Sequence, residues 1–86
     1  MKRSCKTLQN NEQVVFMCYS DIYNKKIPEI GTVVYVYNNK VCVSWMDSYR
    51  ERHTDVDFTD MLAVYNPNGE YMTFEHISGP SDLLEP

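Results

Sequence analysis

Groups that carry out catalysis are scarce in this sequence of 86 residues. It has only two histidines, His53 and His76, and it contains no glycine-rich phosphate loop, no nucleophile-elbow motif and no zinc-ligand spacing. A Cys42–His53 pair on neighbouring strands is the minimum that covalent chemistry needs, but a cysteine within a strand is usually a small apolar filler. We therefore expect a protein that is not an enzyme and that uses no metal or cofactor.

Long apolar runs are also missing. Nothing approaches the roughly 18 apolar residues of a membrane span, and the basic start MKRSCK is followed by the polar stretch TLQNNEQ instead of the apolar part of a signal peptide. The three cysteines, Cys5, Cys18 and Cys42, have no short spacing, and an odd number cannot form a closed set of disulfides. Reduced cysteines indicate the cytosol, so we expect a soluble cytoplasmic domain with no membrane partner.

Lysine and arginine are absent from residues 53–86. All eight lie in residues 1–52 together with five acids, which gives that part a charge of +3, whereas residues 53–86 carry seven acids and a charge of −7 with neutral histidines. Such asymmetry can mark an acidic surface that faces a partner. It is also the ordinary property of a solvated face that keeps a small protein soluble.

Strand-forming residues dominate, and no stretch longer than about a dozen residues has the period of an amphipathic helix. Asn38-Asn39 marks the clearest hairpin, because asparagine tolerates the positive φ of a tight two-residue turn. Residues 20–26 form a long polar loop by their composition, and Pro28 and Gly31 set off the strand that follows. The predicted elements are strands at 13–19, 31–37, 40–47 and about 50–56, a single helical turn at 57–62, and a last hairpin of residues 62–65 and 70–74.

The central hairpin predicts one apolar face and one tyrosine-bearing face. Pairing across the turn places valines opposite valines on the first face, while Tyr35 and Tyr37 fall on the second. Continuing the apolar face into the fourth strand directs Thr54 and Val56 inward and leaves Arg50 and Arg52 at the rim. The expected pairs are Val36 with Val41, Val34 with Val43 and Thr32 with Trp45 on the apolar face, and Tyr37 with Lys40, Tyr35 with Cys42 and Val33 with Ser44 on the other.

Short strands at close spacing predict an all-β domain, either a small barrel or a sandwich. Ile-Gly-Thr-Val-Val at 30–34, Val-Cys-Val-Ser-Trp-Met-Asp at 41–47 and Val-Asp-Phe-Thr-Asp-Met-Leu at 56–62 resemble SH3-like small barrels of the Tudor and KOW kind. The glycine that commonly follows the Asp-Tyr turn of Tudor domains is missing, because Asp47-Ser-Tyr-Arg50 stands there. The resemblance covers about residues 13–65 and implies an SH3-like barrel with a one-turn helix. The C-terminal hairpin lies beyond the usual end of such domains. We therefore expect an SH3-like barrel of five to six antiparallel strands with a C-terminal hairpin at residues 13–77, between a flexible N-terminus at 1–12 and a short tail at 78–86.

The aromatic and acidic residues suggest a protein that binds another macromolecule without catalysing a reaction. Tyrosine combines a large contact area with a hydroxyl group, and exposed carboxylates steer a basic partner. We therefore expect a protein–protein interaction domain, which includes the case of a small acidic, virus-type inhibitor that occludes a host protein or mimics nucleic acid. The expected partner-binding residues are Tyr23, Tyr37, Tyr49, Asp55, Asp57, Asp60, Glu70 and Glu75.

Two other binding functions stay open. The Tudor resemblance implies a cage of aromatic side chains that holds a methylated lysine or arginine by cation–π attraction; its residues would be Tyr19, Tyr23, Trp45 and Tyr49. Against the cage, Trp45 shares the parity of the core valines, and Tyr71 or Phe74 can cover the tyrosine face. The KOW resemblance implies RNA or DNA binding through tyrosines and basic loops, which a net charge of −4 disfavours. The basic residues concerned are Lys25, Lys26, Lys40, Arg50 and Arg52.

Overall fold

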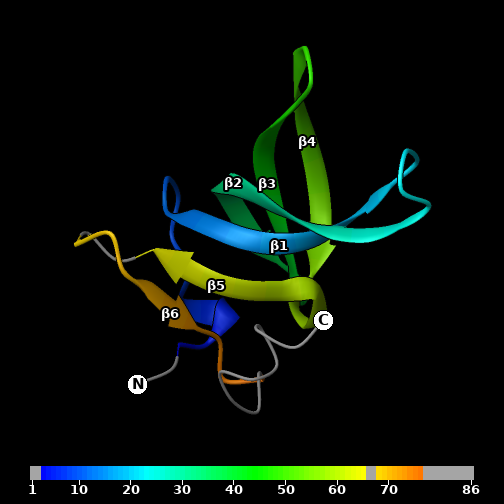
Figure 1. Cartoon of the computed structure of the whole chain (residues 1–86). Coiled ribbons are helices and arrows are strands. Elements are labelled where there is room, and N and C mark those ends of the chain that lie inside the picture. Colours follow the sequence, from blue (N-terminus) through cyan, green and yellow to red (C-terminus); the bar gives the residue numbers. More distant parts are fainter. Residues whose placement is uncertain (1–2, 66–67, 77–86) are drawn as a thin grey trace.

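The computed structural model describes residues 3–65 and 68–76, and its described part is all-β (Figure 1). Two short 3-10 turns are the only helical elements in these residues, so the predicted fold class is confirmed. The predicted tail at 78–86 lies outside the described residues. The elements are η1 (Cys5–Thr7), β1 (Gln13–Ser20), β2 (Lys25–Tyr37), β3 (Lys40–Asp47), β4 (Arg50–Asp57), η2 (Phe58–Asp60), β5 (Met61–Tyr65) and β6 (Tyr71–Thr73).

The strands form one antiparallel sheet in the order β4-β3-β2-β1-β5-β6. The first four strands follow one another as neighbours, and after η2 the chain returns so that β5 pairs with β1. In Figure 1, β3 and β4 run across the direction of β1 and β5, which shows how strongly the sheet is twisted. The sheet is not closed among the described residues, because β4 forms one edge and β6 the other.

The fourth strand lies where the sequence predicts it, as β4, and it continues the apolar face of β3. Val56 lies opposite Val41 and Thr54 opposite Val43, and Val56 is buried as expected. The arginines stay at the rim, where Arg52 makes an ion pair of 3.0 Å with Asp47. The turn of residues 57–62 is confirmed as the 3-10 turn η2, and the last hairpin as β5 and β6.

Strand β2 begins earlier than the sequence predicts. Its first residue is Lys25, so the expected loop of residues 20–26 shrinks to residues 21–24, and Pro28 lies inside the strand. Strand β3 pairs with β2 only from Thr32 onward, so Pro28 has β1 as its one strand neighbour. A proline is tolerated there because one edge of the strand needs no N–H donor.

A β-bulge in β2 overturns half of the predicted hairpin pairing. Tyr35 lies opposite Cys42 as expected, but the register then shifts, and Val33 instead of Val34 lies opposite Val43. The extra residue reverses the side-chain alternation, so Val33 is buried although an outward position was predicted. The amide of Val33 donates 2.8 Å to the carbonyl of Glu12, which ties the bulge to the N-terminal segment.

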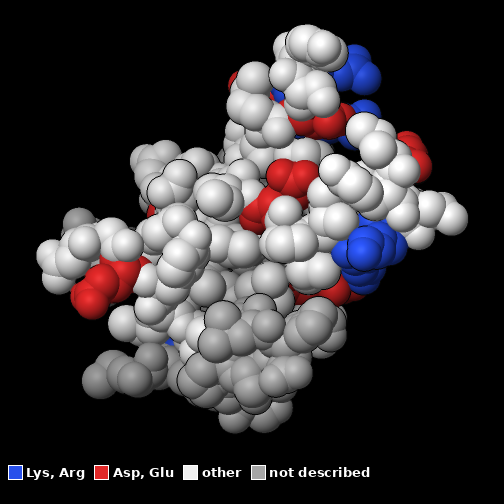
Figure 2. Space-filling model, in the orientation of Figure 1, with Lys and Arg blue, Asp and Glu red and all other residues white. Residues whose placement is uncertain are grey.

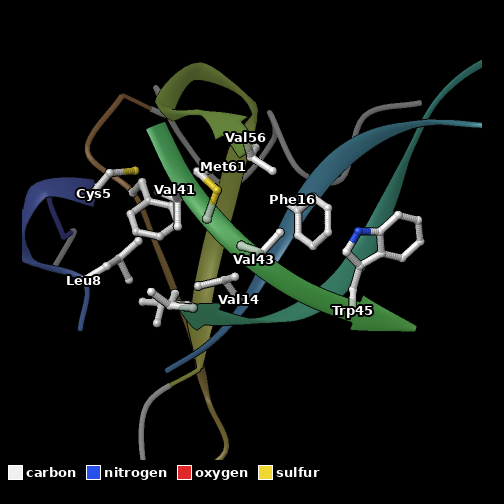
Figure 3. Packing of buried hydrophobic residues seen from close by; sticks show 12 residues of the cluster. Cys5, Leu8, Val14, Phe16, Val41, Val43, Trp45, Val56 and Met61 are labelled. Atoms are coloured by element: carbon white, nitrogen blue, oxygen red, sulfur yellow. The ribbon is translucent and has the colours of Figure 1, made fainter. Parts of the chain in front are cut away.

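The hydrophobic core draws on almost every element of the described chain (Figure 3). The rings of Phe16 and Trp45 meet edge to face with centroids 6.0 Å apart. Burial of such side chains contributes about 1.5–3 kcal/mol each. The buried members are Cys5, Leu8, Val14, Phe16, Val33, Val41, Val43, Trp45, Val56, Met61, Val64 and Phe74.

Two expectations about the ends of the chain change with this core. Cys5 and Leu8 lie in the core, so part of the segment expected to be a flexible start is packed. Arg3 adds a bidentate contact to the Glu12 carboxylate, at 2.5 and 2.9 Å. Phe74 is fully buried and Tyr71 stacks on Tyr65, with ring centroids 4.1 Å apart. Neither ring covers the tyrosine face.

Candidate partner-binding surface

Four of the predicted partner-binding residues come together beside the C-terminal end of β4. The hydroxyl of Tyr37 donates 2.8 Å to the carboxylate of Asp55, and Asp57 follows on the same face of β4. Asp60 stands at the end of the adjoining η2 turn. We call Tyr37, Asp55, Asp57 and Asp60 the β4 carboxylate surface.

An uncovered pair of aromatic rings borders this surface. Tyr35 and Tyr37 project from β2 with ring centroids 5.3 Å apart, and they are 51% and 37% exposed. Tyr35 shares its row of the sheet with Cys42 and Asp55. Alternation along the strand predicted that Tyr35 and Tyr37 share a face, but Tyr35 was not among the expected binding residues.

A hollow of about 260 Å³ opens between β4 and the β1–β2 hairpin. Met17, Cys18 and Val56 give it apolar walls, while three carboxylates of the β4 carboxylate surface stand around it. The residues lining it are Met17, Cys18, Tyr19, Lys26, Thr54, Asp55, Val56, Asp57 and Asp60.

Two lysines hold the outer carboxylates of this surface in place. Lys40 contacts Asp57 at 2.7 Å, and Lys26 contacts Asp60 at 2.9 Å. The hydrogen bond from Lys40 lowers the pKa of Asp57 from its ordinary value, so Asp57 is ionised at neutral pH. The bond to Asp55 raises the pKa of Tyr37, which keeps its hydroxyl a donor.

The other predicted partner-binding residues lie apart from this surface. Tyr23 and Tyr49 occupy the turns at the ends of the β1–β2 and β3–β4 hairpins and are 63% and 97% exposed. Glu70 precedes β6, and Glu75 follows it with its amide bonded to the carbonyl of Arg3. These side chains do not join Tyr37 and Asp55 in one contact area.

The residues expected for an aromatic cage separate in a similar way. Trp45 is a core residue whose indole N–H donates 2.9 Å to the hydroxyl of Thr54. Tyr19 bonds through its hydroxyl to Asn24. Tyr19 and Trp45 line a second hollow of about 200 Å³, but Tyr23 and Tyr49 are not among its lining residues. Its other lining residues are Ser20, Asp21, Ile22, Glu29, Asp47 and Arg52.

The basic residues do not form a separate patch. Lys26, Lys40 and Arg52 each make an ion pair with an aspartate. Figure 2 agrees, since the larger groups of Lys and Arg side chains on this face adjoin Asp or Glu side chains. Phosphate binding depends on unneutralised positive charge, which this arrangement does not concentrate.

Cys42 and His53, the pair considered for covalent chemistry, have other partners. Cys42 is buried opposite Asp55, and burial raises the pKa of its thiol. His53 lies opposite Ser44 and contacts Glu51 at 3.2 Å. Within residues 3–65 and 68–76, no three His, Cys, Asp or Glu side chains are grouped so that they could hold a metal ion.

In the same described ranges there is no helix with the length and apolar character needed to cross a membrane. Comparison with protein-family models, with curated proteins and with solved structures gives no match.

Proposed function

We propose that this chain is a non-catalytic protein-binding module with the topology of an SH3-like small barrel. The four-strand meander, the 3-10 turn and the return of β5 to β1 support this topology, which the resemblance to Tudor and KOW domains led us to expect. Strand β6 extends that pattern beyond its usual end. We further propose that the β4 carboxylate surface is the part that contacts the partner.

The observation that carries the proposal is the hydrogen bond from Tyr37 to Asp55, a residue that lines a hollow with apolar walls. A contact surface needs an apolar part that excludes water and polar groups that set orientation. Met17 and Val56 supply the first, and the carboxylates of Asp55 and Asp57 supply the second. Tyr35 and Tyr37 add exposed ring area beside Asp55.

Charge points to the chemistry of the partner. Each carboxylate has two oxygens with several lone pairs, so the hydrogen bonds from Tyr37 to Asp55 and from Lys40 to Asp57 leave acceptor capacity for a ligand. Residues 53–86 contain no Lys or Arg, and the lysines that contact this surface, Lys40 and Lys26, pair with Asp57 and Asp60 and leave Asp55 without an ion pair among those described. The expected partner is therefore a basic protein segment, and the acids would speed its association at low salt.

A selection from a displayed library of random peptides tests the proposal. Peptides that bind the chain should be enriched in Lys and Arg. The double variant Asp55→Asn/Asp57→Asn should lower their association rate about tenfold and flatten its salt dependence. Asp21→Asn/Glu29→Gln removes the same charge beside the second hollow and serves as the matched control.

Two results would count against this function. If both double variants slow association equally, net charge alone drives the binding and the β4 carboxylate surface has no special part. If the library yields no binder while single-stranded RNA binds at low salt, the chain is a nucleic-acid-binding barrel instead.

A further inference from the structure

Strand β4 is an edge strand whose outer edge has no strand neighbour in the described part of the chain. It runs for eight residues, from Arg50 to Asp57. The opposite edge is less open, because β6 has only three residues and Arg3 forms a parallel bridge with Phe74 just beyond it. An unpaired edge of this length is a template for another extended segment.

One hydrogen bond shows which β4 backbone groups face outward. The amide of Phe58 donates 3.1 Å to the carbonyl of Asn39, so the facing pair Lys40 and Asp57 exchanges no hydrogen bonds of its own. Hydrogen-bonded and non-hydrogen-bonded pairs alternate along an antiparallel ladder, and the β3–β4 register has no shift. The N–H and C=O groups that point away from β3 therefore belong to Glu51, His53, Asp55 and Asp57.

The same residues carry the acidic side chains of the outer face. Successive side chains of a strand alternate between faces, and Val56 points into the core, so Glu51, Asp55 and Asp57 point outward. Backbone donors and acceptors thus lie in one row with three carboxylates. The hollow lined by Met17 and by residues 54–57 lies beside the C-terminal half of this row.

We infer that the β4 edge binds an extended basic segment as an added antiparallel strand, with Lys or Arg at alternate positions facing Glu51, Asp55 and Asp57. This inference rests on the proposed function and specifies its binding mode. In the added strand, the residues between the basic ones face Val56 and Thr54 and are apolar. Backbone hydrogen bonds supply affinity, and the alternating charges fix register.

A second copy of this chain is a poor occupant of the edge. Two copies of β4 paired antiparallel about a two-fold axis share the same two faces, so the outward residues of one copy meet the outward residues of the other. Glu51 would then oppose Asp55 or Asp57. Like charges directly opposite one another destabilise a sheet, which favours a basic partner.

A peptide probe with a defined register tests the inference. The acetylated and amidated heptapeptide Lys-Val-Lys-Val-Thr-Glu-Lys, aligned antiparallel, places its lysines opposite Asp57, Asp55 and Glu51. Binding to the full chain is followed by the amide chemical shifts of β4. At saturation, hydrogen exchange should slow at the amides of His53, Asp55 and Asp57.

Backbone N-methylation separates strand addition from simple charge attraction. Methyl groups on the nitrogens of the third and fifth peptide positions block N–H groups that face β4 and should weaken binding at least about tenfold. Methyl groups on the second and fourth positions lie on the far edge and should change the dissociation constant less than threefold. Both methylated peptides keep the charge of the probe.

The outcomes distinguish this inference from the proposed function. Equal affinity of the two methylated peptides, or unchanged exchange at His53, Asp55 and Asp57, overturns strand addition even if the probe binds. Failure of the probe to bind at millimolar concentration overturns it as well. The proposed function is judged separately, by whether the library selection yields basic peptides that depend on Asp55 and Asp57.

Discussion

The hydroxyl of Tyr37 on β2 donates a 2.8 Å hydrogen bond to the carboxylate of Asp55 on β4, so this bond passes over the intervening strand β3. It joins one aromatic and one acidic member of the β4 carboxylate surface. Because the phenol must stay protonated to donate, the bond orients both side chains only while Tyr37 is neutral.

This bond predicts an altered titration of Tyr37. Its pKa is raised from the ordinary value of 10.0, first by the hydrogen bond to Asp55. Asp55→Asn removes the negative acceptor, so the pKa of Tyr37 should fall back toward that value. The measurement is the pH dependence of the ring carbon chemical shift beside the hydroxyl. Asp57→Asn removes an equal charge that is not bonded to Tyr37 and should leave the pKa nearly unchanged; equal effects of the two variants would contradict the assignment.

Which residues of β3 and β4 face the core was predictable from the sequence, because side chains alternate along each strand. Asn38 and Asn39 have φ values of 46° and 62°, as a tight two-residue turn requires. From this β2–β3 turn, alternation directs Val41 and Val43 to one side, and continuing the apolar face into β4 directs Thr54 and Val56 to the same side. The same alternation placed Asp55 and Asp57 on a common face.

Other features carry no local signal. Val33 and Val34 are both β-branched, so the sequence pattern does not indicate which of them is the extra residue of the bulge. The bulge is bonded to the N-terminal segment through Val33, and this long-range contact has no local signal. Cys5 and Leu8 are isolated in a polar stretch, which conceals their place in the core.

Because the local sequence does not reveal long-range packing, it also predicted only part of the candidate site. Tyr23 and Tyr49 have the same chemistry as Tyr37 but occupy the ends of two different hairpins. The direction of each hairpin depends on the twist of the whole sheet, which long-range packing sets. Asp60 joins Asp57 because the η2 turn follows β4 directly.

The packed N-terminal segment predicts a loss of stability when Leu8 is shortened. Leu8 is buried in the core at its N-terminal end (Figure 3). Leu8→Ala should lower the free energy of unfolding by about 2–3 kcal/mol, measured by urea denaturation. Lys6→Ala changes an exposed residue of the same segment and should alter it by less than about 0.5 kcal/mol. Equal denaturation midpoints for the two variants would mean that the segment is not part of the fold.

The contact between Arg3 and Glu12 predicts a pH dependence of stability. The hydrogen bond from Arg3 lowers the pKa of Glu12 below its ordinary value of 4.5. A carboxyl group with a lower pKa in the folded state stabilises the fold above the unfolded-state pKa, and this stability is lost as pH falls through the folded-state value. The wild type should therefore lose about 1 kcal/mol below pH 4.5 relative to Glu12→Gln.

Denaturation curves of both proteins at pH 7 and at successive values below pH 4.5 measure this difference. Glu75→Gln is a suitable control, because within residues 3–65 and 68–76 Glu75 bonds to Arg3 through its backbone amide and not through its carboxyl group. A wild-type advantage over Glu12→Gln that stays constant with pH would show that the ion pair does not contribute through ionisation of Glu12.

The close approach of three strands at Gly31 predicts that even one added methyl group is costly. A Cβ at this position would lie 2.9 Å from a ring carbon of Phe16, 2.9 Å from the carbonyl oxygen of Ser44 and 3.3 Å from the Cβ of Trp45. Because the Ser44 contact is backbone, Gly31→Ala should cost about 1–3 kcal/mol and shift the fluorescence of Trp45, the single tryptophan. Gly69→Ala adds its methyl group in open space and should cost about 1 kcal/mol through its positive φ of 83° alone, without a change in fluorescence. An equal or smaller cost at Gly31 would mean that β2 and β3 separate easily there.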